Sequence, residues 1–170
     1  LTHITAPAPF SFTTRYVYDL NGNLLRLERQ APSGTQNTSY TYTALDQLKT
    51  ITDHQGNVTQ FQYDPNGNRK KVIDAELRET NYLYDERDLL YQVTDANQGV
   101  TTYGYDPNGN LSSIQDANTH TTTYTYDEFD RLIEMTYPDG TSKESYTYDP
   151  ASNLKTKTDP KGQVIQYDYD

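Results

Sequence analysis

Length, composition and charge leave a narrow range of protein classes. The chain has 170 residues, 24 of them acidic and 14 basic, for a net charge of −10, and it has 17 tyrosines and no cysteine. The basic residues form no stripe that could neutralise phosphates, and no apolar run is long enough to span a membrane. We therefore expect no nucleic-acid partner, no membrane insertion, and neither disulfides nor thiolate metal sites.

Residues 1–13, LTHITAPAPFSFT, lack the pattern of the rest of the chain. We expect them to form a leader strand or a partial repeat. The chain begins at Leu1 without a charged n-region or an apolar h-region, so no signal peptide is predicted in it. We interpret it as a piece excised from a longer protein.

Residues 14–170 are predicted to be a tandem array of about seven repeats, each anchored on a tyrosine. The hexamer YDPNGN stands at 63–68 and again at 105–110, with the near-copy YDLNGN at 18–23. Internal periodicity on this scale indicates a repeat architecture. The anchors, 21 to 24 residues apart, are Tyr18, Tyr42, Tyr63, Tyr84, Tyr105, Tyr126, Tyr148 and Tyr169. Asp follows seven of them, at Asp19, Asp64, Asp85, Asp106, Asp127, Asp149 and Asp170.

Each repeat is predicted to contain two turns. The first turn follows the anchor: its Asp opens a type I turn, Pro fits the second corner, and Gly takes the left-handed residue of a three-residue loop with a bulge. The second turn begins with an Asp eleven residues after the anchor, as in DHQGN, DANQG and DPKGQ. Four residues after the anchor stand turn formers, which are Gly22, Asp46, Gly67, Asp88, Gly109, Asp130 and Ser152 in successive repeats.

The segments between the turns, such as TTTYTYD, alternate Thr and Tyr with a period of two, which is typical of half-buried strands. Aromatic residues also stand two positions before every anchor, so 15 of the 17 tyrosines fall in two columns. The sequence therefore predicts an all-β fold without helices, in which hairpin repeats of about 21 residues form one long, twisted antiparallel sheet. The longer first step contains QAPSGTQNTS at 30–39, which we expect to be a surface loop.

Two apolar columns leave one question open. Leu recurs six residues after the anchor, except at Arg69. Nine residues after the anchor stands Ile or Val (the Ile/Val column), or Leu27 or Met135 in their place, except at Lys157. Because the difference is odd, a regular strand would place the two columns on opposite faces. Either a bulge shifts the parity, or Leu packs away from the aromatic face.

The pattern of Tyr-Asp-x-x-Gly-Asn-Leu, then Val or Ile, then Asp-x-x-Gly, then aromatic-x-Tyr-Asp resembles the YD repeats of the Rhs family. Related repeats occur in Tc toxin shell subunits, wall-associated proteins and teneurins. The resemblance covers about residues 14–170. It implies a secreted or surface-displayed bacterial protein whose repeat strip spirals into a shell around a C-terminal toxin or other effector.

The resemblance also sets limits on what transfers to this chain. About seven repeats are fewer than a closed shell of the family has, so we expect a curved, open segment. The family's self-cleaving aspartate centre lies beyond the last repeats and has no counterpart here, since Asp159-Pro160 falls inside a second turn. We therefore expect no enzymatic activity.

Other chemistry was weighed against structural roles. Asp64, Asn66 and Asn68 have the spacing of calcium-loop ligands, but Gly falls at position four and no Glu stands at position twelve, which favours a turn in which Asp accepts backbone N–H bonds. The recurring carboxylates, such as Asp127, Glu128 and Asp130, are interpreted as turn caps rather than a catalytic pair. His3, His54 and His120 stand in separate segments without a nucleophile. No catalytic residue, cofactor or metal site is predicted.

The tyrosine rows have two readings. They form the inner face of a structural sheet, with Thr59, Thr80, Thr101 and Thr122 beside them, or they bind sugars or a polypeptide. We favour a non-catalytic shell segment whose partners are the rest of the parent shell and its enclosed effector. The alternative is a surface adhesion module that binds carbohydrate, and the exposed strand edges also suggest self-association. The predicted scaffold positions are Tyr18, Asp19, Gly22, Tyr63, Asp64, Gly67, Tyr84, Asp85, Tyr105, Asp106, Gly109, Tyr126, Asp127, Tyr148, Asp149 and Tyr169.

Overall fold

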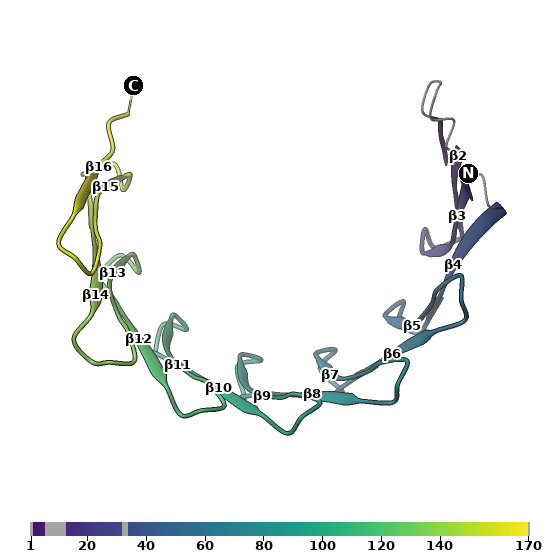
Figure 1. The fold of residues 1–170 in the computed structure, drawn as a ribbon, viewed down its shortest axis with the longest axis horizontal. Helices are drawn as coiled ribbons and strands as arrows, with labels where there is room; N and C mark the ends of the chain where they lie inside the picture. Colours follow the sequence, from purple (N-terminus) through teal and green to yellow (C-terminus); the bar gives the residue numbers. More distant parts are fainter. Residues whose placement is uncertain (1, 6–12, 32–33, 170) are drawn as a thin grey trace. The chain divides into compact units, whose positions relative to one another are not determined.

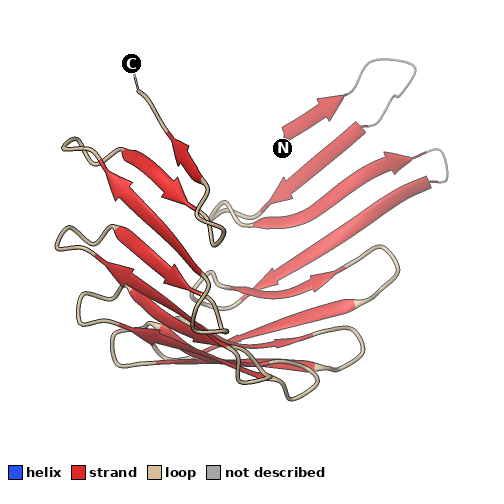
Figure 2. Cartoon of the chain, turned by 60° about the vertical axis from the view of Figure 1, so that its left-hand side comes forward, coloured by secondary structure: helices blue, strands red, loops and turns tan. Residues whose placement is uncertain are grey.

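The computed structural model describes residues 2–5, 13–31 and 34–169. This part of the chain consists of strands and the turns between them, and it has no helix (Figure 2). Neighbouring strands in the sheet follow one another in chain order and pair antiparallel, as predicted. No helix in the described residues is therefore long and apolar enough to cross a membrane.

Sixteen strands are present in the described residues, most of them five or six residues long. They are β1 (Thr2–Thr5), β2 (Thr13–Tyr18), β3 (Leu24–Ala31), β4 (Gly34–Tyr42), β5 (Leu48–Thr52), β6 (Val58–Tyr63), β7 (Arg69–Ile73), β8 (Glu79–Tyr84), β9 (Leu90–Thr94), β10 (Val100–Tyr105), β11 (Leu111–Gln115), β12 (Thr121–Tyr126), β13 (Leu132–Thr136), β14 (Lys143–Tyr148), β15 (Leu154–Thr158) and β16 (Val164–Gln166).

The chain divides into two compact units, Leu1–Asn81 and Tyr82–Asp170, with the division inside β8. Unit 1 contains β1 to β7, and unit 2 contains β9 to β16. In unit 2 the successive strands from β9 to β16 follow a bend, and those of unit 1 do the same (Figure 1). β1, which lies in the segment expected to be a leader or partial repeat, pairs with β2.

A bulge answers the question of parity. In the first-turn hairpin β12–β13 the register shifts by one residue just before the anchor tyrosine, so that Tyr126 lies opposite Leu132 and Tyr124 lies opposite Met135. Directly opposed residues share a face of the sheet, as do residues two apart in one strand. The Leu column and the Ile/Val column therefore both lie on the face that carries the tyrosines. The same shift occurs in the hairpins β2–β3, β4–β5, β6–β7, β10–β11 and β14–β15.

The predicted turn type is confirmed. In the turn at 64–68, the amide of Asp64 donates to the carbonyl of Asn68 (2.9 Å), and the amide of Gly67 donates to the carbonyl of Asp64 (3.1 Å). Gly67 has a φ of 94°, in the left-handed region that glycine adopts without a steric cost. All seven residues that stand four positions after an anchor have positive φ, including Asp46, Asp88, Asp130 and Ser152, for which the sequence predicted only a turn.

Two repeats depart from the common length, and the structure gives the reason for each. The expected surface loop at 30–39 is wrong: β3 and β4 extend through residues 30, 31 and 34–39 and pair up to Ala31 opposite Gly34, while residues 32 and 33 lie outside the described part. The first step is longer because the hairpin β3–β4 has longer strands, not because it contains an irregular loop. The 22-residue step comes from a turn in which Tyr137 pairs with Ser142 and which therefore has one more residue.

The sheet is a single layer without a buried core. Among the described residues no hydrophobic and no polar side chain is buried, although most strand residues are half-buried. Stability must therefore come from contacts between neighbouring strands on each face and from the hydrogen-bond ladder.

Candidate functional site

The tyrosine face is the sheet surface that carries the two aromatic columns, together with the Leu and Ile/Val columns. Register places Thr59, Thr80, Thr101 and Thr122 on it as well, because each lies opposite an Ile or Val of this face. Most of its rings are half-buried, whereas Tyr18 and Tyr169 are 43% and 56% exposed. The rings thus share one side of the sheet, as the sequence predicted.

The anchor tyrosines tie each repeat to the one before it. The hydroxyl of Tyr126 donates to the main-chain carbonyl of Leu111 (2.9 Å), and that of Tyr105 donates to Leu90 (2.8 Å). The backbone pairing between β11 and β12 stops at Ser113 and Thr123, so Tyr126 bonds Leu111 where the two strands are no longer paired through their backbones. Equivalent bonds join Tyr42 to Leu24, Tyr63 to Leu48, Tyr148 to Leu132 and Tyr169 to Leu154.

The environment of these hydroxyls favours the protonated phenol. Burial raises the pKa of Tyr42, Tyr105 and Tyr126 above the usual value, and nearby carboxylates at Asp19, Asp85 and Asp106 raise it further. Desolvation penalises a phenolate, and a negative neighbour penalises it too. Tyr42, Tyr105 and Tyr126 therefore remain hydrogen-bond donors throughout the neutral range.

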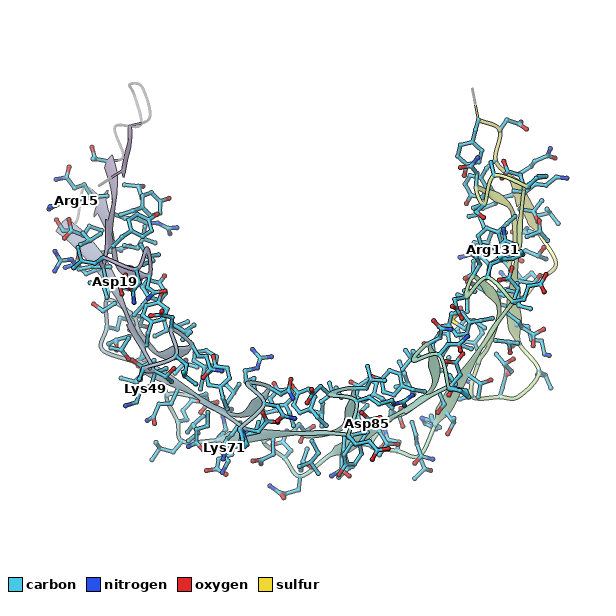
Figure 3. The ribbon with its side chains drawn as sticks, turned by 180° about the vertical axis from the view of Figure 1, so that it is seen from behind. Arg15, Asp19, Lys49, Lys71, Asp85 and Arg131 are labelled. Carbon is cyan, nitrogen blue, oxygen red and sulfur yellow. The ribbon has the colours of Figure 1, made fainter. Side chains whose placement is uncertain are left out.

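The opposite face of the sheet is mainly polar and charged, with scattered apolar residues such as Leu83 and Val100. Thr41 and Thr50 share a hydrogen bond between their hydroxyls (2.7 Å), and Lys71 forms an ion pair with Glu79 (2.6 Å). Figure 3 shows Arg15, Lys49 and Lys71 on one side of unit 1. The aromatic columns thus lie on one face of the sheet, and most of the charged strand residues lie on the other.

One polar cluster interrupts the tyrosine face, near its end in unit 2. Glu144 replaces the Thr of other repeats and Lys157 replaces the Ile or Val, and their side chains form an ion pair (2.9 Å). The hydroxyls of Tyr146 and Tyr137 donate to the same carboxylate (2.6 and 3.2 Å). These bonds, led by that of Tyr146, lower the pKa of Glu144, whose side chain is only 13% exposed. The cluster is fully hydrogen-bonded on the carboxylate side.

Both kinds of turn use their Asp in the same way. In the first turn at 19–23, Oδ1 of Asp19 accepts the amides of Asn21 and Asn23 (2.9 and 2.8 Å), and Oδ2 accepts the side-chain amide of Asn23 (3.0 Å). Asp53 makes the same three bonds in a second turn, with Gln55 and Asn57. The pKa of Asp53 is lowered, first by the side-chain amide of Asn57. The Asx-turn interpretation is confirmed, because these oxygens already hold N–H groups.

The other candidate residues are dispersed. Asp127 caps its turn and pairs with Arg131 (2.7 Å), while Asp130 occupies the left-handed residue of that turn. His120 contacts Asp116 of its own turn (3.2 Å). In the described part of the chain no three His, Asp or Glu residues are grouped as metal ligands would be. His3 lies in β1, of whose side chains the structure says nothing.

Sequence reasoning missed two features. The bond from the anchor hydroxyl to the Leu carbonyl has only a weak signal: the anchor is Tyr in all eight copies, whereas the column two residues earlier has Phe at 61. The ion pair of Glu144 and Lys157 did have a signal. Each residue is the charged exception in an uncharged column, and the two exceptions fall in neighbouring strands.

Tandem hairpins, an aromatic face and a polar face together define a β-repeat protein that forms a wall one sheet thick. Over residues 4–170 the chain matches the family model described as Teneurin YD-shell, and it belongs to this family. The resemblance to YD repeats is thereby confirmed, and the family is one of structural shell repeats. No curated protein matches the chain significantly.

Solved structures with the same fold are Tc toxin shell proteins. The crystal structure of TcdB2-TccC3 with Cdc42 has a TM-score of 0.70 over 86% of this chain, at 20% identity. The structure of the Photorhabdus luminescens Tc holotoxin pore has a TM-score of 0.67 over 91% of this chain, at 21% identity. The chain spans 9% of the length of each of these proteins, and at such identity the likeness shows the fold alone.

Proposed function

We propose that the chain is a non-catalytic wall segment of a larger, secreted YD-repeat protein whose shell encloses a C-terminal effector. Residues 14–170 are the repeat array, and residues 1–13 continue it as a leader or partial repeat. The anchor Tyr, the Asp after it and the left-handed turn residue are its scaffold positions. The partners are the remaining repeats of the parent shell and the polypeptide inside it.

The observation that carries the proposal is the separation of the two faces of a sheet that has no core. A single-layer sheet leaves its apolar face exposed unless something lies against it. Closure of a longer strip turns that face inward, toward a cargo. The membership of the shell family and the fold shared with Tc toxin shell proteins support this reading.

The adhesion alternative, in which rows of tyrosines hold glycans, has less support. Six anchor hydroxyls already donate to main-chain carbonyls, such as that of Tyr105 to Leu90, and so cannot donate to a sugar. A glycan-binding screen on the chain tests this alternative directly. Ligands that bind with millimolar affinity or better, and that are lost when Tyr103 is replaced by Ala, would favour adhesion over enclosure.

The enclosure proposal is tested in the full-length parent protein by limited proteolysis. Tyr103→Asp with Tyr124→Asp places charges on the tyrosine face, and Thr102→Asp with Thr123→Asp places the same charges on the polar face. We expect the effector to stay protected in the wild type and in the polar-face variant. It becomes cleavable, or loses its place in the shell, in the tyrosine-face variant.

Two results would contradict the proposal. One is an effector that is digested in the wild type as fast as the isolated effector. The other is equal sensitivity of the two double variants while both retain the circular dichroism spectrum of a folded sheet, because contact with a cargo through the tyrosine face requires them to differ.

A further inference from the structure

The first six of the first turns are of two kinds that alternate along the chain. Turns 1, 3 and 5 end in Asn-Gly-Asn, with Gly at the left-handed position, at 21–23, 66–68 and 108–110, whereas turn 7 ends in Ala-Ser-Asn with Ser152 at that position. Even-numbered first turns have Asp at this position instead, at Asp46, Asp88 and Asp130. An L-residue with φ near 60° is strained relative to Gly, although Asp tolerates this region better than most residues.

In unit 1 the side chains of turn 1 hold the Asp of turn 2. The side-chain amide of Asn21 donates to both carboxylate oxygens of Asp46 (3.1 and 3.3 Å), and that of Asn23 donates to Oδ1 (2.7 Å). The second hydrogen of the Asn23 amide goes to Asp19 of its own turn (3.0 Å). One amide thus bridges two carboxylates from turns that lie 25 or so residues apart in sequence but adjacent along one edge.

Turns 5 and 6, in unit 2, repeat this arrangement. Asn108 and Asn110 donate to Oδ1 of Asp130 (2.8 and 2.6 Å), and Asn110 also bonds Asp106 of its own turn (3.1 Å). Two independent copies, one in each unit, therefore have the same donors, the same acceptor and the same bridging amide. We call this contact the turn clamp.

The step from an even turn to the following odd turn is different. Arg87 of turn 4 donates to the main-chain carbonyl of Asp106 in turn 5 (3.0 Å), and Gln47 of turn 2 reaches the carbonyl of Gly67 in turn 3 (3.4 Å). A carbonyl is present whatever residue stands there, so these two contacts do not select a partner. The step from turn 6 to turn 7 differs, because Arg131 donates to the hydroxyl of Ser152 (3.0 Å). A side chain at 67 would instead crowd Gln47, whose Nε2 would lie 3.2 Å from a Cβ.

The clamps lie along only one long side of the sheet, the row of first turns at the strand ends, which we call the first-turn edge. On this side the pairing between β11 and β12 ends at Ser113 and Thr123, two residues short of the start of β11. On the opposite edge, the described second turns bond within themselves, as Asp95 does with the amides of Asn97 and Gly99. Their left-handed residues include Leu77, Gln98 and Thr119, none of which has the charged carboxylate that the clamps use.

We propose that the building block of this protein is a pair of hairpins rather than one hairpin: an Asn-Gly-Asn turn followed by an Asp-cornered turn that its amides clamp. The near-identical hexamers at 18–23 and 105–110 each open such a pair. The Asp at the corner is a positioning residue that fixes which repeat can follow which. The order of repeats is then specified by side chains at one edge.

The test exchanges left-handed residues between two turns, so that composition and the number of strained corners stay constant. Gly109→Asp with Asp130→Gly moves the carboxylate away from its two donors. The matched control, Gly56→Leu with Leu77→Gly, makes the same kind of exchange on the edge without clamps. We expect the melting temperature to fall by about 2–4 °C or more in the first double variant and to change by less than half as much in the control.

A double-mutant cycle keeps the proposal testable if the exchange prevents folding. Asn108→Ala and Asp130→Ala should be non-additive, with the double variant losing less stability than the sum of the single losses. Asn97→Ala and Thr119→Ala, at equivalent positions and equal separation on the other edge, should be additive. Additivity in both cycles, or equal shifts of melting temperature in the two exchanges, would overturn the proposal.

Discussion

The hydroxyl of an anchor tyrosine should contribute measurably to stability although the ring is only half-buried. In Tyr126→Phe the ring keeps its contacts and only the bond to the carbonyl of Leu111 (2.9 Å) is lost. A net intramolecular hydrogen bond contributes about 0.5–1.5 kcal/mol, and we expect a loss of this size because the backbone ladder has no pair at that point to compensate.

Tyr124→Phe is the matched control for this substitution. Tyr124 stands two residues earlier on the same face, and the structure shows no hydrogen bond from its hydroxyl within the described residues. The column of Tyr124 also contains Phe61 in another repeat. We expect the control to change the free energy of unfolding by no more than about 0.5 kcal/mol.

Urea unfolding followed by circular dichroism measures both changes, with the midpoint compared at equal m-value. Equal losses for Tyr126→Phe and Tyr124→Phe would refute the reasoning, since a general effect of removing a hydroxyl would then suffice. A stable Tyr126→Phe would refute it as well. In a repeat array the loss should be largest in the repeats beside residue 126, which hydrogen exchange can resolve.

Three further outcomes are expected. Gly109→Val should lower the free energy of unfolding by about 1–2 kcal/mol or more, because a β-branched residue resists a φ of 92°. Asn108→Ala should lower it by less. Thermal melts that reverse this order would contradict the turn assignment. The pKa of Asp139 is lowered to about 2, chiefly by the hydroxyl of Ser142, and the pKa values of Asp19 and Asp53 are also lowered. These carboxylates therefore stabilise the fold above the unfolded-state pKa near 4, and this stabilisation is lost as the pH falls toward 2. A melting temperature that stays constant down to pH 2 would contradict the role of these turns. Lys157→Ile alone should lower the free energy of unfolding by about 1–2 kcal/mol, because it leaves the carboxylate of Glu144 without its cation. Lys157→Ile with Glu144→Thr should recover most of that loss, since it restores the residue types of the other repeats. Urea unfolding of the single and double variants decides this.

The sequence predicted the repeat, the turn type and the shared face of the rings because each depends on local chemistry or on a period of two. Gly67 between two Asn residues has few alternatives to a left-handed corner, and a Tyr-x-Tyr pair within one strand must share a face. The same reasoning gave the wrong result at 30–39. Polar residues such as those of QAPSGTQNTS are found in loops and also on the exposed face of a long hairpin, and only pairing distinguishes the two.

The features that the sequence did not predict involve residues in different repeats. The bulge shifts the Leu column onto the tyrosine face through the register of two strands, and Tyr126 reaches Leu111 across a strand boundary. The clamp between Asn108 and Asp130 joins two turns that are separated by an entire hairpin. Such contacts have no local signature, because each residue alone is an ordinary occupant of its turn or strand.

These longer-range contacts meet at the first-turn edge, and this has a consequence for how a wall one sheet thick can hold together. At that edge the bulge ends the ladder between repeats early, as at Ser113 and Thr123, so backbone pairing alone would leave the repeats free to separate there. The hydroxyl of the anchor tyrosine spans the gap on one face of the sheet, and the Asn–Asp clamp joins the turns just beyond it. Side chains thus replace the missing backbone bonds. A sheet without a core can in this way resist splaying at one edge, whereas the turns of the other edge bond only within themselves in the described residues.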